Sequence, residues 1–338
     1  MHMAEMSTPA AGHGVFRASD SKLAPIRQIL FGIDAADASF ARRGFGPTTP
    51  ARQLRLEQIG RCFVAGYNAA IRTADPVAVV NDLAAPAEEL GGFAFEGAAM
   101  GFALLDLLAP WRSRRFAHFV AGPASPQIYM AYVGAGWALA RTSHRLAWRL
   151  GKLDPLLRWL LFDGYGFHAG YFHHRDAIDR QRRPSALAGY ARNVFDQGLG
   201  RAIWFAKGAD IRAVAATASS FAEDRRADLW SGIGLAASYA GGVEADDLSA
   251  LAAASGPYCT HLGQGAAFAA KARERAGNPA PHTERGCRVF CGMGAAAAAA
   301  ITDQALPDVG LGDRGEAFQA WRTEIRRRIG ASCGEAAS

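Results

Sequence analysis

The stretch Leu229-Trp-Ser-Gly232-Ile-Gly234-Leu-Ala-Ala-Ser-Tyr239 contains a Gly-x-Gly motif that recurs through the chain. Successive complete copies are separated by 29 to 34 residues, and a longer step of 42 separates Gly92 from Gly134. The complete copies begin at Gly134, Gly164, Gly198, Gly232, Gly263 and Gly292, and degenerate copies begin at Gly60 and Gly92. A unit of this length that repeats along a chain predicts a stacked array of similar supersecondary elements.

An apolar or alanine-rich run of helical length follows each motif, as in Ala295 to Ala300. Alanine and glycine form strands poorly, and the polar alternation of a strand is absent, so the runs predict helices. Glycine inside a helix costs about 1 kcal/mol relative to alanine. We therefore expect a compensating gain, and close approach between neighbouring helix backbones supplies one.

The stretch from Leu229 to Gly242, with the acidic segment Glu244 to Asp247 after it, resembles the tetratricopeptide repeat. Trp, Leu, Gly and Tyr occur at comparable offsets in the first helix of that repeat. The resemblance implies helix pairs. The sequence thus predicts an all-α fold, an α-solenoid of about eight tetratricopeptide-like repeats, in an open right-handed form.

The chain has 338 residues, and half of them are hydrophobic, which is enough for a large core. We expect one helical-repeat domain over residues 25–330. A disordered N-terminal segment, 1–24, is expected before it, and a C-terminal tail, 331–338, after it. The apolar run from Gly91 to Trp111 contains Glu96 and Asp106, so it predicts a buried helix and not a membrane span.

Lysine and arginine outnumber the acids, 37 to 31, and arginines cluster near residues 112–115, 180–183 and 326–328. Acids or apolar positions at helical spacing accompany each cluster, which favours solvated helix faces over a nucleic-acid surface. The five cysteines form no paired framework, which favours a reducing, cytoplasmic setting. Cys287 and Cys291 lack a second ligand pair, so no metal site is predicted, and no motif indicates a cofactor.

Alignment on the first glycine brings Glu96 and His168 to one position, four residues on, where the other copies carry Val or Ala. Equivalent positions of a solenoid share a face, so the two side chains are candidate catalytic residues at the ends of an elongated ligand. Burial of Glu96 among phenylalanines would raise its pKa, as a general acid requires. The alternative is structural: each side chain is satisfied by a neighbouring backbone or arginine.

Polar residues also lie beside the glycines. Asp163 and Asp196 are candidates for helix caps, and Arg201 is placed to pair with Asp196 or to meet an acidic ligand. Aromatic side chains are frequent near the motifs, which favours either core packing or a groove for a flat, unsaturated ligand. The candidate ligand-binding residues are Tyr165, Phe167, Asp196, Gln197, Arg201, Trp204 and Trp230.

Four stretches, Gly92 to Met100, Asp163 to His173, Phe195 to Phe205 and Ala227 to Ala236, together resemble a bacterial family of unassigned biochemical function. Its members are encoded in polyketide gene clusters, notably beside enediyne polyketide synthases. The resemblance covers roughly Phe31 to Ala305. It implies a role in maturing or handling an enediyne precursor, and it assigns no catalytic residue.

Three hypotheses remain open. The first is a cytoplasmic accessory protein of natural-product biosynthesis that binds a hydrophobic polyene or enediyne intermediate and catalyses a cofactor-independent cyclisation or isomerisation. The second is a non-catalytic scaffold that docks a polyketide synthase or another biosynthetic enzyme. The third is a self-resistance protein that sequesters the finished product.

Overall fold

The computed structural model describes residues 23–83, 87–108, 114–143, 147, 150, 152–306 and 315–335. Within these ranges the regular structure is helical, and no strand occurs. The all-α prediction is therefore confirmed. The expected disordered segment lies, up to residue 22, outside the described residues, as do residues 336–338 of the expected tail.

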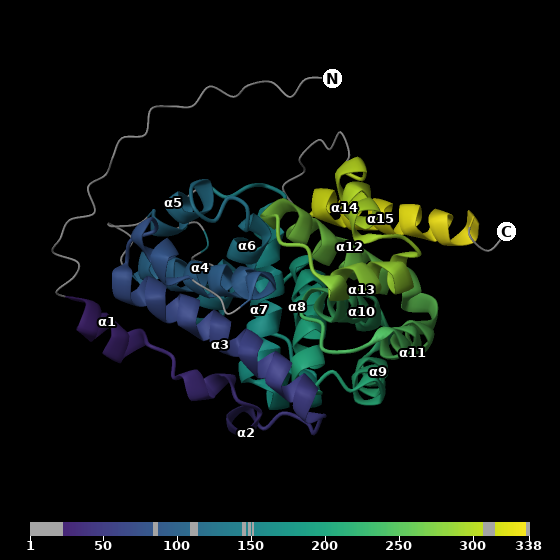
Figure 1. Cartoon of the computed structure of the whole chain (residues 1–338), viewed down its shortest axis with the longest axis horizontal. Helices are drawn as coiled ribbons and strands as arrows, with labels where there is room; N and C mark the ends of the chain where they lie inside the picture. Colours follow the sequence, from purple (N-terminus) through teal and green to yellow (C-terminus); the bar gives the residue numbers. More distant parts are fainter. Residues whose placement is uncertain are drawn as a thin grey trace, which may run out of the picture.

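Seven helices carry the recurrent motif or its degenerate form, and each packs against the next one in chain order (Figure 1). The last of them packs against an eighth helix, which begins directly after the final copy, so Gly292 and Gly294 lie in the loop before that helix. These helices form a serial stack, in which each one contacts the helix before it and the helix after it. Its members are α3 (Pro50–Thr73), α4 (Gly91–Leu108), α6 (Ile128–Arg141), α7 (Leu160–Phe172), α8 (Ala191–Ala206), α10 (Glu223–Tyr239), α12 (Cys259–Ala276) and α14 (Ala295–Gln304).

The segments between the stacked helices differ along the chain. In the second half they are full helices: α9 (Ile211–Ser220), α11 (Ala245–Ser255) and α13 (Pro281–Cys291). In the first half, where the resemblance to helix-pair repeats implies full partner helices, they include the short 3-10 helices η3 (Ala78–Asp82) and η7 (Leu157–Trp159). Before α8, turns at residues 185–190 stand in place of a partner helix.

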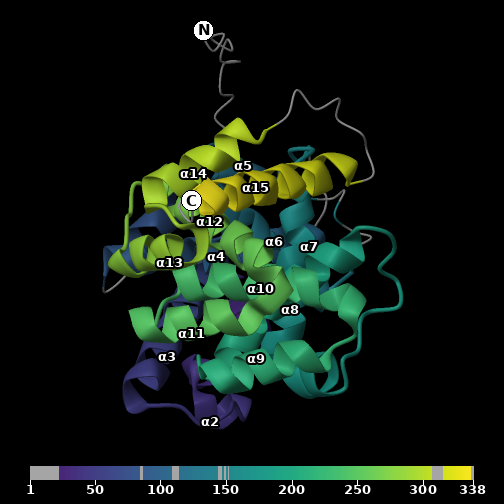
Figure 2. The ribbon, with the colours of Figure 1, turned by 90° about the vertical axis from the view of Figure 1, so that its right-hand side faces the viewer.

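The remaining elements flank the stack. The last helix, α15 (Glu316–Glu335), lies across its end beside α12 and α14 (Figure 2), and it continues past residue 330. The others are α1 (Ala24–Phe31), η2 (Ala35–Ala38), α2 (Phe40–Arg43), η4 (Glu88–Leu90), α5 (Arg115–Ala121), the π-helix η8 (Arg175–Asp179) and η9 (Gly256–Tyr258).

The glycines are the points at which neighbouring backbones meet. A Cβ on Gly164 would fall within 3.0 Å of the carbonyl oxygen of Val133, in the preceding helix. A Cβ on Gly166 would do the same to Phe195, in the following helix. The pairs in α6, α8 and α10 repeat this arrangement. The expected close approach of neighbouring backbones is therefore confirmed for these four helices. For the last copy it is wrong, because Gly292 and Gly294 lie in a loop between two helices.

The same contacts correct the alignment of two copies. In α4 it is Gly97, not Gly92, that faces the carbonyl of the preceding helix, and in α12 it is Gly265, not Gly263. Glu96 thus stands immediately before the structurally equivalent glycine. His168 lies four residues after Gly164, so the predicted shared position of Glu96 and His168 is wrong.

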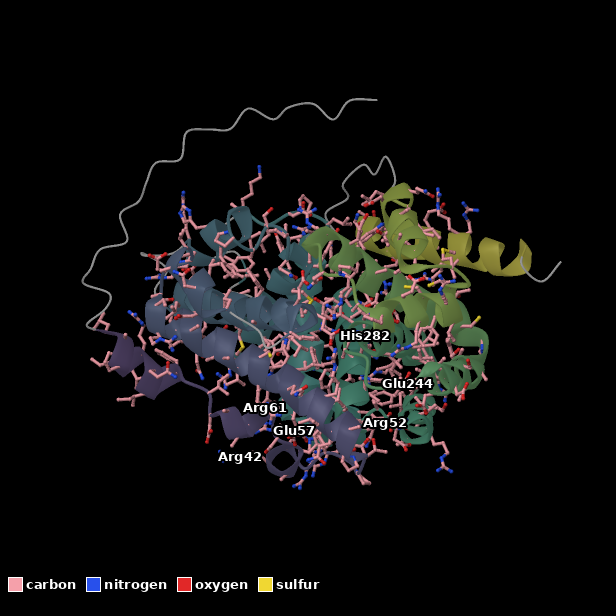
Figure 3. All side chains as sticks on the ribbon, in the orientation of Figure 1. Arg42, Arg52, Glu57, Arg61, Glu244 and His282 are labelled. Atoms are coloured by element: carbon pink, nitrogen blue, oxygen red, sulfur yellow. The ribbon has the colours of Figure 1, made fainter. Side chains whose placement is uncertain are left out.

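The first helices of the stack also contact later ones, so the expected open form is wrong. Arg55 of α3 donates to the Ala240 carbonyl at the end of α10, with 3.0 Å between nitrogen and oxygen. Arg52 pairs with Asp247 at 2.6 Å, and Asp247 accepts from the backbone nitrogen of Glu244. Figure 3 labels Arg52 and Glu244 on the two sides of this junction.

One helical stretch within the described ranges, Glu88–Leu108, is long and apolar enough to cross a membrane. Buried residues make up 89% of its apolar window. It packs between α3 and α6 in the stack.

Candidate functional site

Five stacked helices place a polar side chain directly before the glycine that faces the preceding helix, and these side chains form a buried polar column. Gln197 Nε2 donates to Asp163 Oδ2 at 2.7 Å, and Ser231 Oγ donates to Gln264 Oε1 at 2.9 Å. The column runs through the interior of the stack. Its members are Glu96, Asp163, Gln197, Ser231 and Gln264, each no more than 1% exposed.

Arg201 of α8 joins two carboxylates of the column. Its Nη1 donates to Asp163 Oδ1 at 2.5 Å, and its Nη2 lies 3.9 Å from Glu96 Oε1. Burial alone lowers the pKa of Arg201, but the charges of Asp163 and Glu96 outweigh burial and raise that pKa. The alternative pairing of Arg201 with Asp196 is wrong, because Asp196 binds Arg225 at 2.5 Å.

Glu96 is fully buried and only partly satisfied. Its Oε1 accepts a hydrogen bond from Trp137 Nε1 at 3.1 Å, whereas its Oε2 has no hydrogen-bond partner among the described residues. Burial raises the pKa of Glu96 to about 7, and the nearby charge of Arg201 opposes this rise. The predicted rise is therefore confirmed, and near neutral pH both protonation states are populated.

Glu96 opens into an aromatic hollow between α3, α4, α6, α7 and α8. The hollow has a volume of about 20 Å³, which is room for a water molecule. Asp37 and Gly60 complete its wall on the side of η2. The aromatic members of the wall are Phe63, Phe93, Trp137, Phe167, Tyr171, Phe172 and Phe205.

The segment of residues 35–45 covers this hollow. A Cβ on Gly60 would collide with Ala38 of η2, so η2 lies directly on α3. Arg43 of α2 pairs with Asp37 at 2.9 Å and stands 4.9 Å above the ring of Phe172. Figure 3 shows Arg42, Glu57 and Arg61 near each other on the same face.

His168 does not line the aromatic hollow. Its ring packs against Trp137 and Phe172, with centroids 5.6 and 4.8 Å away. Burial lowers the pKa of His168 to about 3, and the charges of Arg141 and His173 act in the same direction. The imidazole is therefore neutral near pH 7, and it contacts Glu96 only indirectly, through Trp137.

The predicted ligand-binding residues separate into two groups. Phe167 lines the aromatic hollow, and Arg201 and Gln197 belong to the polar network beside it. The others do not line this hollow, namely the half-buried Tyr165, the ion-paired Asp196, Trp204, whose Nε1 donates to the Gly241 carbonyl at 3.3 Å, and the buried Trp230.

The aspartates are not helix caps. Asp163 is the fourth residue of α7, and its carboxylate accepts from Gln197 and Arg201. Asp196 lies in the middle of α8. Both carboxylates are instead buried, and each pairs with an arginine from the next helix of the stack.

A second hollow lies on the other side of Arg201, between α6, α7, α10, α12 and α15. Its volume is about 40 Å³, and its wall is mostly apolar, with Val133, Leu160, Leu235 and Phe268. Asp163, Arg201 and Tyr239 also line it. The ion pair of Asp163 and Arg201 therefore borders this second hollow, while Glu96 borders the aromatic one.

Sequence reasoning missed the roles of Trp137 and Tyr239. Trp137 donates to Glu96, and Tyr239 reaches Gly92 across the junction between the two ends of the stack. The polar residue before each glycine was the available signal for the column. For Tyr239 no local signal exists, because its contact with α4 joins residues more than 140 positions apart.

Among the described residues, arginines of two clusters pair with nearby acids, and three of the cysteines are buried. Arg180 pairs with Asp176, and Arg327 and Arg328 pair with Glu324. Cys287 and Cys291 are buried and lie near the Ala266 and Gly263 carbonyls of α12. Across the described part of the chain, no group of three His, Cys, Asp or Glu side chains could hold a metal ion.

A family model matches residues 22–329, which is most of the chain, and its description is "Protein of unknown function (DUF1702)". The chain belongs to this DUF1702 family. The match includes all eight stacked helices and the column between them. A search of curated proteins and a search of solved structures found no match.

Proposed function

We propose that this protein acts in the biosynthesis of an enediyne or related polyketide, where it binds a hydrophobic polyene or enediyne intermediate in the aromatic hollow. The observation that carries the proposal is Glu96, a buried carboxyl with a pKa of about 7 and one unpartnered oxygen, in a wall of aromatic rings. The resemblance to proteins encoded beside enediyne synthases supports the same ligand class.

The proposed reaction is a cofactor-independent isomerisation or cyclisation by proton transfer. Protonated Glu96 gives its proton to one carbon of a conjugated double bond, which leaves a cation delocalised along the polyene. The faces of Trp137 and Phe167 stabilise such a cation. Loss of a proton from another carbon to the Glu96 carboxylate forms the new double bond and restores the acid, so the step needs no oxidant or reductant.

A polyene is larger than the hollow as it stands, so binding requires the cover segment to move. This segment buries Ala38 and Phe40, and polar contacts hold its ends. The backbone nitrogen of Phe40 donates to Glu57 Oε1 at 3.0 Å, and that of Gly46 donates to the Ala206 carbonyl at 2.8 Å. Contacts of this kind exchange readily with water, so the segment is a suitable entrance.

The test is the Glu96→Gln variant, introduced into a strain that makes the corresponding natural product. The amide keeps the shape of the side chain and removes the transferable proton. We expect product titre to fall at least tenfold, with protein level and melting temperature maintained. The matched control is Glu223→Gln, which alters an exposed side chain that lines neither hollow. An unchanged titre in Glu96→Gln would refute the catalytic proposal.

Native mass spectrometry of protein from the same strain separates the alternatives. A bound intermediate that accumulates in Glu96→Gln supports catalysis. Tight retention of the finished product supports self-resistance. Co-purification of a synthase, without any small molecule, supports a scaffold.

We further propose that the stack is a solenoid of tetratricopeptide-like repeats whose ends meet, and that the protein works in the cytoplasm near a polyketide synthase. The serial packing of eight helices, seven of which carry the motif, supports the solenoid. The pairing of the arginine clusters with acids leaves them poorly suited to nucleic acid.

A further inference from the structure

One residue in the wall of the second hollow carries a hydroxyl group without a partner. Tyr239 lines this hollow and is 2% exposed, and its hydroxyl makes no hydrogen bond within the described residues. The ring itself is held firmly, with the Arg273 guanidinium 4.1 Å from its centroid and Phe93 against it at 5.2 Å. Burial of an unpaired hydroxyl is unfavourable, so a ligand group that pairs with this hydroxyl would be stabilised there.

A second unpartnered oxygen lies beside the first. Gln127 is 9% exposed and occupies the N-cap position of α6 without a capping hydrogen bond from its side chain. It adjoins the hollow without lining it, since the same helix supplies Tyr129 and Met130 to the wall, and its Oε1 also makes no hydrogen bond to a described residue. Both oxygens face Gly92. A Cβ there would stand 3.2 Å from Gln127 Oε1 and closer still to the Tyr239 hydroxyl.

The two groups are complementary to one ligand hydroxyl. The Tyr239 O–H donates a hydrogen bond, and the Gln127 carbonyl oxygen accepts one. A ligand hydroxyl can accept from the first and donate to the second.

The rest of the hollow disfavours a charged ligand. Its ion pair of Asp163 and Arg201 is internally compensated, and Lys271 is bound by Glu274 and Asp303 at 2.6 and 2.7 Å. The other wall residues are largely apolar. An uncharged, apolar group therefore fits this environment best.

We infer that the second hollow binds the uncharged, apolar end of an elongated ligand that carries a hydroxyl group, which Tyr239 and Gln127 recognise. This inference rests on the proposed function, since Arg201 lines the second hollow and lies 3.9 Å from Glu96 in the first. One ligand can thus extend past the ion pair. Outward rotation of the half-buried Tyr129, Leu235 and Phe268 widens the hollow from its present volume.

The experiment compares two fluorescent probes with the full-length protein. They are 1,6-diphenyl-1,3,5-hexatriene, a conjugated hydrocarbon, and its derivative with one para-hydroxyl group. We expect the hydroxylated probe to bind wild type about 3- to 10-fold more tightly, as one or two net hydrogen bonds imply. Tyr239→Phe and Gln127→Met each reduce that preference and leave the affinity for the hydrocarbon unchanged.

Tyr132→Phe is the matched control, since its hydroxyl is already engaged by the Asp154 backbone nitrogen at 2.9 Å and it does not line the hollow. It retains the preference of wild type. Equal affinity of wild type for both probes, or binding of neither, overturns the inference and indicates that the two oxygens hold only water. The preference for the hydroxylated probe is expected in Glu96→Gln as well, whether or not that residue is catalytic. The catalytic proposal is therefore judged separately, by product titre.

Discussion

Arg201 Nη2 lies 3.9 Å from Glu96 Oε1, and both side chains are buried in the interior of the helix stack. The guanidinium is also bound to Asp163, so two carboxylates share one cation. If both acids were ionised, the cluster would carry a net negative charge in a poorly solvated setting. The balance is consistent with a Glu96 that gains and loses its proton near neutral pH.

Stability should depend on pH through Glu96. The folded-state pKa is about 7 and the ordinary value is 4.5, so the folded protein binds this proton more tightly than the unfolded chain. As pH rises from about 4.5 to 7, this group lowers the free energy of unfolding by about 3 kcal/mol, and the loss levels off above pH 7. Urea denaturation of wild type and Glu96→Gln at several pH values measures it. Parallel curves for the two proteins would contradict the assignment.

Loss of Arg201 should be more damaging than loss of an exposed arginine. Arg201→Met leaves Asp163 and Glu96 buried without their cation, and we expect the free energy of unfolding to fall by about 3 to 5 kcal/mol. Arg180→Met removes a surface pair with Asp176 and should change it by less than about 1 kcal/mol. If the two variants lost equal stability in thermal or urea unfolding, the buried ion pair would contribute no more to stability than the surface pair.

The motif glycines should not tolerate a methyl group. A Cβ on Gly198 would fall well within 3.0 Å of the Asp163 carbonyl oxygen, so Gly198→Ala forces α7 and α8 apart. We expect a loss of about 3 kcal/mol or more. Gly91→Ala is the control, since that residue begins α4 with helical angles and open space around it. There the substitution should be neutral or stabilising by up to about 1 kcal/mol.

The C-terminal helix should depend on one buried arginine. Arg322 of α15 is 1% exposed, and it lies 2.8 Å from Asp228 and donates to the Tyr190 hydroxyl at 2.8 Å. Arg322→Leu should lower the free energy of unfolding by about 3 to 5 kcal/mol. Arg327→Leu, on an exposed face of the same helix, should leave the free energy of unfolding nearly unchanged. Similar melting temperatures for the two variants would argue against an anchoring role.

His168 should remain neutral over the physiological range. Burial lowers its pKa to about 3, so the unfolded chain takes up this proton first and the contribution of His168 to stability is lost as pH falls below about 6.5. Its ring nitrogens, observed by NMR between pH 5 and 8, should show no titration. A midpoint near 6.5 would restore it as a candidate acid.

The helical class and the close approach at the glycines followed from sequence, because Gly-x-Gly within alanine-rich runs has few other physical explanations. The position of Glu96 did not follow. Gly92 and Gly97 both fit the spacing, and only the contact of Gly97 with the Phe63 carbonyl distinguishes them. With Gly97 as reference, Glu96 aligns with Asp163 and Gln197.

Contacts between residues far apart in the sequence could not be predicted from the repeat pattern. The approach of Tyr239 to Gly92, and of Arg55 to the Ala240 carbonyl, depends on how small rotations between successive helices accumulate. A period in the sequence fixes which helices are neighbours but not the angle between them. Both hollows are formed by that accumulated curvature, so neither could be derived from spacing alone.

The glycine contacts have a mechanical consequence. At these glycines no side chains separate the backbones of neighbouring helices. A displacement of one helix is therefore passed directly to the next helix. A guest molecule that pushes Trp137 aside will therefore shift α6 and α7 as rigid bodies. We therefore expect that a ligand bound in the aromatic hollow changes the width of the second hollow.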